Sequence, residues 1–295
     1  MKSVLALGEV LWDLFPEGPR FGGAPANFAC ACAELGGPHL RVSLSSAVGR
    51  DGLGDEARRR LSGHGVDGSH LAVNGHPTGR VFVQAGASGT NDYRFSNDDA
   101  WDHIPVTPHL LATAAAADVV CFGTLGQRAA ESRETIRAVV NATRPGCLRV
   151  LDVNLRATYW SPALLLDSLA LANVVKLNDE ELPIVARVVG ESGGEAAVLE
   201  RIRDRFDLKL LALTRGASGS RLVAADGITD DRPGEPVDVV NTVGAGDAFT
   251  AALALGLVFG HPLARTHAWA ADIAAFVCTQ PGGTCTFPPQ LRLLP

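Results

Sequence analysis

The sequence has few lysines and no long run of basic residues. Lysine occurs at only three positions among 26 basic residues, so arginine carries most of the positive charge. Arginine suits bidentate binding of phosphate or carboxylate groups. The formal net charge of −6 argues against nucleic acid or an anionic membrane surface as the main partner. Any anionic ligand must therefore be held by local groups.

The sequence also lacks closely paired cysteines and long hydrophobic runs. Its six cysteines lie mostly within apolar stretches and form no C-x-x-C pair, which favours buried free thiols over a disulfide framework or a zinc site. No stretch reaches the length of a transmembrane helix, and Glu9 makes the first residues acidic too early for a signal peptide. We therefore expect a cytoplasmic protein.

Apolar β-like runs alternate with helical patterns along most of the chain. This alternation predicts an α/β fold with a mostly parallel sheet, in one domain that spans residues 1–295. Pro25 at the start of one helix and Gly36 and Gly37 at its end form a typical helix frame. The patterns predict strands at 3–7, 41–48, 118–122, 148–153, 173–177 and 209–213, and helices at 51–63, 129–142, 246–260 and 263–279.

The pattern changes between residues 66 and 104. Short alternating runs at 69–73, 79–85 and 91–95, separated by glycine-rich turns, predict a small antiparallel sheet inserted between the βα units. Together with residues 10–21, we interpret this segment as a lid over a site. Polar and aromatic lid residues could contact a ligand or pair two copies in a homodimer: Arg80, Tyr93, Arg94 and Trp101.

A glycine-rich turn at residues 241–249 is the main chemical feature. It follows a β-like run at 237–240, and Gly244 and Gly246 leave the N–H groups of the next helix open to an anion. Asp247 would repel a phosphate that was merely bound, so it indicates catalysis. Held ionised beside the positive helix end, it could accept a proton from a hydroxyl that attacks a phosphoryl group. A tight turn with Asp as the helix cap is the alternative interpretation.

Further polar residues lie where they could face this turn. The clusters at 152–156, 178–181 and 214–216 each follow a predicted strand, and ligands bind at this edge of an open parallel sheet. Asn27 lies in the first turns of the helix that begins after Gly22 and Gly23. For Asp13 and Asn27 taken singly, a surface or capping role is the favoured alternative. We expect the loop at 280–284 to lie beside the glycine-rich turn.

These motifs together resemble those of the ribokinase-like, or PfkB-type, carbohydrate kinases, in the bacterial fructokinase-like branch. The resemblance implies a Rossmann-like α/β/α sandwich with a small antiparallel β lid. It also implies transfer of the γ-phosphoryl group of ATP to a sugar hydroxyl, with fructose as the favoured acceptor. The motifs that carry it are Gly8-Glu9 with Asp13, and residues 22–27, 48–54, 152–156, 178–181 and 242–247.

The resemblance also implies roles for individual residues. Asp247 would be the general base, with Gly244, Ala245 and Gly246 as the anion hole and Arg156 near the phosphate charge. Asp13, Gly23 and Asn27 would hold the sugar, where Arg94 could pair with an acidic sugar. Asn178 and Glu181 would organise Mg²⁺ through water, and Thr214, Gly216 and Gly219 would lie at the nucleotide.

One residue departs from the family pattern. The family usually carries Asp six residues before its base, in a loop associated with a bound monovalent cation, and this chain has Asn241 there. The loss of that charge weakens the expectation of K⁺ activation and leaves the expected base unchanged.

Three other functions are compatible with parts of the pattern. The same fold could phosphorylate 2-keto-3-deoxygluconate or a nucleoside. The chain could also be a sugar-binding regulator without turnover, although the presence of Asp247 argues against this. The hypothesis that the chain is a dehydrogenase depends on the G-x-G-x-x-A match at 52–57. This match is weak, because a turn separates it from the preceding strand.

Overall fold

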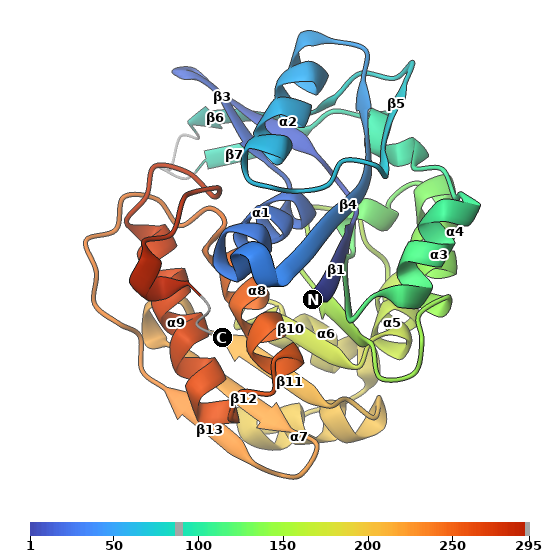
Figure 1. Ribbon diagram of the computed structural model, residues 1–295. Coiled ribbons are helices and arrows are strands. Elements are labelled where there is room, and N and C mark those ends of the chain that lie inside the picture. The colour runs from blue at the N-terminus through green and yellow to red at the C-terminus, as the bar shows by residue number, and fades with distance from the viewer. Residues whose placement is uncertain (86–90, 293–295) are drawn as a thin grey trace.

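The computed structural model describes residues 1–85 and 91–292, which form a large sheet covered by helices and a smaller sheet at one end (Figure 1). The large sheet has nine strands in the order β13-β12-β11-β10-β9-β8-β1-β4-β5. The strands from β11 to β5 pair in parallel, and β12 and β13 pair antiparallel at the edge. The predicted α/β architecture with a mostly parallel sheet is confirmed.

The strands of the large sheet are β1 (Lys2–Leu7), β4 (Leu40–Gly49), β5 (Leu71–Asn74), β8 (Val119–Gly123), β9 (Leu148–Asp152), β10 (Val174–Asn178), β11 (Leu210–Thr214), β12 (Ser220–Ala224) and β13 (Thr229–Arg232). The strands predicted from apolar runs match β1, β4, β8, β9, β10 and β11 closely, whereas β13 is polar and was not predicted.

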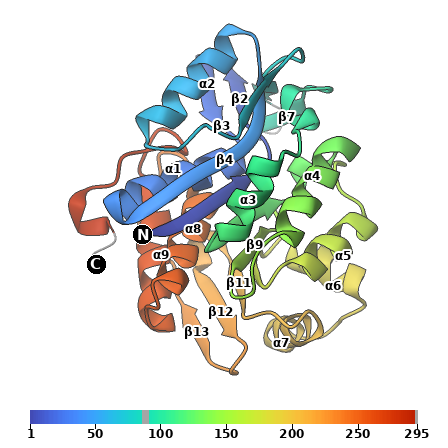
Figure 2. The ribbon, with the colours of Figure 1, turned by 45° about the vertical axis from the view of Figure 1, so that its right-hand side comes forward.

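Helices cover both faces of the large sheet, as Figures 1 and 2 show. One face carries α1 (Ala24–Gly36), α2 (Gly52–Gly63), α8 (Ala245–Val258) and α9 (Leu263–Cys278). The other carries α3 (Pro108–Ala116), α4 (Ala130–Asn141), α5 (Pro162–Leu171), α6 (Leu182–Val189) and α7 (Glu195–Arg205). In β1, Val4 and Ala6 pack in the first core, and Leu5 and Leu7 in the second. Strand alternation thus explains why β1 is apolar throughout.

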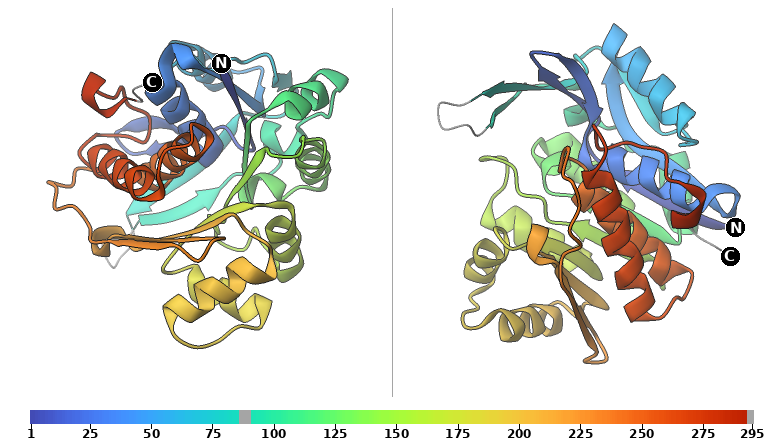
Figure 3. Two further views of the ribbon diagram at one scale, coloured as in Figure 1. Left: turned by 60° about the horizontal axis from the view of Figure 1, so that its bottom comes forward. Right: turned by 90° about the vertical axis from the view of Figure 1, so that its left-hand side faces the viewer.

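The smaller sheet lies beside α2 at one end of the large sheet, where the Trp12 indole donates to the Leu53 carbonyl of α2, and its strands at 79–85 and 91–95 extend outward (Figure 3). Its strand order is β3-β2-β6-β7, formed by β2 (Leu11–Phe15), β3 (Gly18–Gly22), β6 (Gly79–Ala85) and β7 (Asn91–Phe95). The β2–β3 and β6–β7 pairs are antiparallel, and β2 and β6 pair in parallel. Two distant chain segments therefore build this sheet together.

Two strand predictions were wrong. The run at 69–73 does not join the smaller sheet, because Asp67 bonds with the backbone of β4 and guides β5 into parallel pairing with that strand. The run at 237–240 is an exposed loop, with Val239 and Val240 61% and 64% exposed. The Val240 N–H donates to Cys278 at the end of α9, so this segment is tied to a helix and not to the sheet.

Short 3-10 turns complete the described chain: η1 (Gly37–His39), η2 (Ala100–His103), η3 (Leu125–Gln127), η4 (Gly216–Ser218) and η5 (Pro289–Leu291). All six cysteines are free thiols, and four of them are buried. Among the described residues, the helices are too short or too polar to cross a lipid bilayer.

Candidate active site

The N-terminal ends of α1 and α8 meet at the carboxyl edge of the large sheet. Asp247 lies in the first turn of α8, and Asn27 in the first turn of α1. The Asn27 side-chain amide donates to Asp247 Oδ2 at 2.8 Å, across 220 residues of sequence. The structure therefore brings together two residues that the sequence analysis had singled out separately.

The turn before Asp247 depends on a glycine. Gly244 caps α8 with a left-handed backbone (φ 83°), and a methyl group there would lie 2.4 Å from the Cα atom of Gly283. A larger residue would be strained and would collide with the 280–284 loop. The expected proximity of this loop to the glycine-rich turn is confirmed.

A buried charge network lies directly beneath the turn. A methyl group at Gly246 would lie 3.0 Å from Lys176 Nζ, which donates to Asp152 Oδ1 at 3.1 Å. The Thr250 hydroxyl donates to the other oxygen of Asp152 at 3.0 Å. Lys176 and Asp152 are only 6% and 5% exposed, so each charge needs the other.

The sequence analysis overlooked Lys176. Its signal was a single charged residue inside the otherwise apolar run of β10, where a buried cation needs a nearby anion. The parallel pairing of β10 with β9 supplies that anion, because Lys176 stands opposite Asp152 in the register.

Burial raises the pKa of Asp247 to about 6, and the charge of Asp152 adds to this effect. The hydrogen bond from Asn27 and the charges of Lys176 and Arg156 act in the opposite direction. The sequence analysis expected the positive helix end to hold Asp247 ionised, and the structure adds burial as an influence in the opposite direction. At neutral pH the group remains mostly a carboxylate whose proton affinity suits a general base.

Glu9 is a second buried acid that the sequence analysis left without a role. It is 3% exposed, and its Oε1 accepts a hydrogen bond from the Ala24 N–H at 3.2 Å. Its Oε2 has no hydrogen-bond partner among the described residues. Glu9 lines a cavity of about 20 Å³ together with Asp152, Asp247 and Thr250, which is room for one water molecule. Burial raises the pKa of Glu9 to about 7.

We expect Glu9→Gln to stabilise the protein above neutral pH. Because folding raises this pKa from 4.5 to about 7, the stabilising contribution of Glu9 is greatest below pH 4.5 and is lost as the pH rises through 7. Gln cannot ionise, so the gain in the free energy of unfolding should be near zero at about pH 4.5 and reach about 1–3 kcal/mol at about pH 8. Urea unfolding at both pH values measures this.

The exposed Glu17→Gln variant is the matched control and should show no such pH dependence. If Glu9→Gln is the less stable protein at both pH values, then burial of an ionised Glu9 is not the dominant effect.

The residues expected around the sugar lie near Asp247. Burial raises the pKa of Asp13 to about 6, and the positive charges of Arg156 and Arg20 oppose that rise. Arg156 also lowers the pKa of Glu9 and Asp247, so its exposed side chain lies close to all three acids. Gly23 caps α1, four residues before Asn27.

Two lid residues differ in their availability to a ligand. Arg94 is exposed on β7, with its guanidinium 5.6 Å from the centre of the Phe82 ring. Trp101 is completely buried, and the Arg128 guanidinium covers its ring at 3.9 Å, so it cannot contact a ligand as the sequence analysis allowed.

The residues expected at the metal and nucleotide follow neighbouring strands. Asn178 and Thr214 are paired at the ends of β10 and β11. Glu181 accepts hydrogen bonds from the Asn178 and Leu155 N–H groups at 2.9 and 2.8 Å, and Asn178 Oδ1 accepts one from the Glu181 N–H at 2.8 Å. Gly216 and Gly219 flank the turn that leads into β12.

The positive charge of Lys176 acts on the carboxylates of Asp152, Glu181 and Asp247. Burial lowers the pKa of Lys176, but Asp152, Glu181 and Asp247 raise it by more, so the ammonium group remains charged. Burial raises the pKa of Glu181, and the charge of Lys176 opposes that rise. The ammonium group of Lys176 therefore contacts Asp152 directly and also lowers the electrostatic repulsion among the three carboxylates at the sheet edge.

The dinucleotide pattern at 52–57 forms the first turns of α2, directly after Asp51. Asp51 caps α2 by accepting a hydrogen bond from the Gly54 N–H at 2.8 Å, and it also binds the backbone and hydroxyl of Thr78. The pattern therefore anchors α2 to the segment that leads into β6.

Comparison with known proteins gives a consistent result. The family model for pfkB family carbohydrate kinases matches residues 18–289. A fructokinase of Salmonella typhimurium is 34% identical over 268 residues, which cover 86% of this chain and 84% of the relative. A crystal structure of a sugar kinase from Pyrococcus horikoshii in complex with ATP is 28% identical, with a TM-score of 0.80 and coverage of 96% and 94%.

A fructokinase from Vibrio cholerae, solved with fructose, ADP and calcium, has the same fold with a TM-score of 0.81. It is 24% identical to this chain, and the match covers 99% of this chain and 96% of that protein.

Proposed function

Because the chain belongs to the PfkB family of carbohydrate kinases and is an ATP-dependent sugar kinase, we propose that its acceptor is fructose. The fructokinases among its relatives support this choice, at up to 34% identity. The single structural observation that supports phosphoryl transfer to a sugar hydroxyl is the Asn27–Asp247 contact, in which a hydrogen-bonding amide lies beside a carboxylate at the start of α8.

In the proposed reaction, Asp247 accepts the proton of the sugar hydroxyl that attacks the γ-phosphorus of ATP, and ADP leaves as the bond from this phosphorus to the bridging oxygen breaks. The N–H groups of Gly244, Ala245 and Gly246 at the start of α8 would stabilise the charge that develops on the transferring phosphoryl group, once the Ala245 N–H releases the Thr242 carbonyl, to which it donates at 3.3 Å. Arg156 supplies further positive charge from the loop after β9. Little covalent help is needed, because phosphoryl transfer depends mainly on alignment and charge neutralisation.

Asp13 and Asn27 are proposed to hold the sugar, with Gly23 at the start of α1 beside them. A carboxylate and an amide suit vicinal hydroxyls, which both donate and accept hydrogen bonds. Thr214, Gly216 and Gly219 are proposed to contact the nucleotide at the end of β11. The smaller sheet is proposed to close over the sugar as a lid, and two lids could pair in a homodimer.

The family uses ATP with a metal ion, and the residues at the end of β10 fit Mg²⁺. Glu181 uses one hydrogen bond on each oxygen to order the backbone, which leaves carboxylate lone pairs for metal-bound water. Asn178 and Glu181 would therefore hold Mg²⁺ through water. When bound, the ion would neutralise charge on the phosphates of ATP.

K⁺ activation is a weaker part of the proposed function. Asn241 already uses both polar atoms of its side chain within the loop, because Oδ1 accepts from the Val243 N–H at 3.0 Å and Nδ2 donates to the Pro281 carbonyl at 3.2 Å. A neutral amide whose polar atoms are already hydrogen-bonded attracts a monovalent cation more weakly than the charged aspartate of the family pattern would.

We expect a panel of acceptors to show fructose as the preferred substrate, by about tenfold or more in kcat/KM over 2-keto-3-deoxygluconate and nucleosides. The measurement is ADP release coupled to a colour reaction, with each acceptor at several concentrations. The Arg94→Gln variant tests the acidic alternative, because Arg94 is an exposed cation of the smaller sheet that could pair with a sugar carboxylate.

Arg94→Gln should turn over fructose at a rate within about threefold of that of the parent protein, because fructose has no charge with which Arg94 could pair. If 2-keto-3-deoxygluconate is preferred and Arg94→Gln selectively lowers its turnover, the acceptor is the acidic sugar. Sugar binding by calorimetry without any ADP release would identify a regulator instead.

A further inference from the structure

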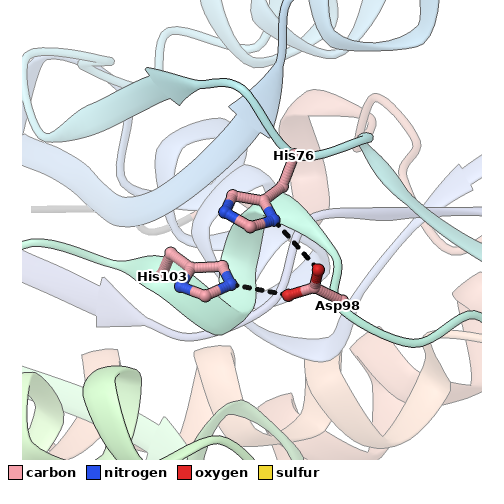
Figure 4. Close-up of side chains that lie close together, drawn as sticks. All are labelled: His76, Asp98 and His103. Atoms are coloured by element: carbon pink, nitrogen blue, oxygen red, sulfur yellow. Dashed lines mark hydrogen bonds and ion pairs between the residues drawn. The ribbon is translucent and has the colours of Figure 1, made fainter.

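Three side chains that the proposed reaction does not use gather at the base of the smaller sheet. His76 lies between β5 and β6, Asp98 follows β7, and His103 is the last residue of η2. Figure 4 shows the Asp98 carboxylate facing both imidazole rings, with Oδ2 3.3 Å from His76 Nδ1 and Oδ1 2.8 Å from His103 Nε2. One ligand atom from each residue lies within 4.8 Å of the other two.

The two rings are held in the same orientation. Their centroids are 3.8 Å apart and their planes differ by 18°, so the rings stack and present nitrogen atoms to the same carboxylate. The side chains of His76, Asp98 and His103 are 36%, 72% and 29% exposed, so a dissolved ion can reach them.

Glu131 on α4 prepares His103 for a metal. Its Oε2 lies 2.8 Å from His103 Nδ1, and because a carboxylate only accepts, Nδ1 must carry the hydrogen. Nε2 is then the nitrogen that can bind a metal once it has released its own proton. Histidine ligands of metal ions generally make such a contact through the other nitrogen, which fixes the ring and increases its basicity.

We propose that His76, Asp98 and His103 bind one divalent transition-metal ion, with Zn²⁺ as the best match. Two imidazole nitrogens and one carboxylate oxygen suit Zn²⁺, whereas Mg²⁺ prefers oxygen ligands alone. Zinc bonds of about 2.0–2.2 Å would place tetrahedral ligand atoms about 3.4 Å apart. A metal ion lies in the plane of each histidine ring that binds it, so one of the two stacked rings must turn out of the stack, and the exposed Asp98 must rotate as well. Water completes the coordination.

The position of this site suggests what the ion does. His76 precedes β6 by three residues, and Asp98 follows the end of β7 by three residues. The two connecting segments already touch, because the Ala100 N–H donates to the Pro77 carbonyl at 2.8 Å and the Asn74 amide donates to the Ala100 carbonyl at 3.0 Å. A bound ion would cross-link both connections and restrain β6 and β7 relative to the large sheet.

The test is calorimetric titration of the metal-free protein with Zn²⁺, with Mg²⁺ in excess to occupy oxygen-rich sites. The parent should bind one more Zn²⁺ per chain than the His76→Gln/His103→Gln double variant. The single variant His103→Gln should weaken this binding about tenfold or more. The matched control is His109→Gln, which removes another surface histidine that packs beside a second ring, 4.6 Å from that of His70.

Two further measurements separate this site from other zinc ligands. Co²⁺ in place of Zn²⁺ should give visible absorption typical of nitrogen and oxygen ligands, and this absorption should disappear in the double variant. Zn²⁺ should also raise the Tm of the parent and of His109→Gln, but not that of the double variant. If the double variant does not fold, Asp98→Asn replaces it in each comparison.

Equal zinc stoichiometry and affinity in the parent and the double variant would overturn the assignment. An equal loss of zinc binding in His109→Gln would overturn it as well. Both readouts are independent of sugar phosphorylation, so they stand whatever the acceptor proves to be.

Discussion

Asp247→Asn is expected to lower kcat about 10²- to 10⁴-fold while the protein keeps its fold and its affinity for sugar. The amide is isosteric with the carboxylate and can still accept the 2.8 Å hydrogen bond from Asn27, but it cannot take a proton from the attacking hydroxyl. Steady-state ADP release measures kcat, and calorimetry with fructose measures binding. A loss confined to kcat is the signature of an interaction made in the transition state.

Asp55→Asn is the matched control, because Asp55 is also an acid in the first turn of a helix, exposed on α2. Its kcat should equal that of the parent. In the parent, kcat/KM should rise with pH through about 6, since the pKa of Asp247 is raised to that value by burial and by Asp152. If Asp247→Asn keeps more than a tenth of the parental kcat, another group accepts the proton.

Lys176→Met is expected to destabilise the protein by about 3–5 kcal/mol and to abolish turnover. Removal of the ammonium group leaves the buried Asp152 carboxylate with the Thr250 hydroxyl as its remaining partner, and it withdraws positive charge from Glu181 and Asp247. The methionine side chain fills a similar volume, so the loss reports on charge and not on a cavity. Urea unfolding at neutral pH measures the free energy of unfolding.

The double variant Lys176→Met/Asp152→Asn separates an unpaired charge from a general packing defect. Because it removes both buried charges, it should regain much of the stability lost in Lys176→Met. Lys209→Met, at an exposed lysine of the same chain, should have no measurable effect and serves as the control. A double variant no more stable than Lys176→Met would show that the ion pair is not the cause.

Much of the fold could be predicted from local pattern. The buried parallel strands are continuous apolar runs, and β6 and β7 begin and end as predicted, at Gly79–Ala85 and Asn91–Phe95. The valine run at 237–240 gave a false strand, because alternation shows only that a segment could be half buried. Its actual partner, the carbonyl of Cys278, lies too far along the chain for a local pattern to reveal.

The candidate site was predictable in its residue types but not in its contacts. Glycines before a helix are compatible with an anion site, and this signal led to the prediction at Gly244 and Gly246. The same signal at 52–57 marks a helix start capped by Asp51. The roles of Lys176 and Glu9 depend on which groups face them after folding, Asp152 in one case and a small cavity in the other. The pKa of Asp247 likewise depends on burial of this carboxylate, which could not be predicted from the sequence.

The close approach of Gly244 to Gly283 and the Asn27–Asp247 contact have a consequence for refolding. Asn27 and Asp247 are separated by 220 residues of sequence, so their contact closes a long loop of chain. Such contacts are slow to form, because the entropy of loop closure must be overcome first. Catalytic activity should therefore return only in the last phase of refolding, after the secondary structure has formed.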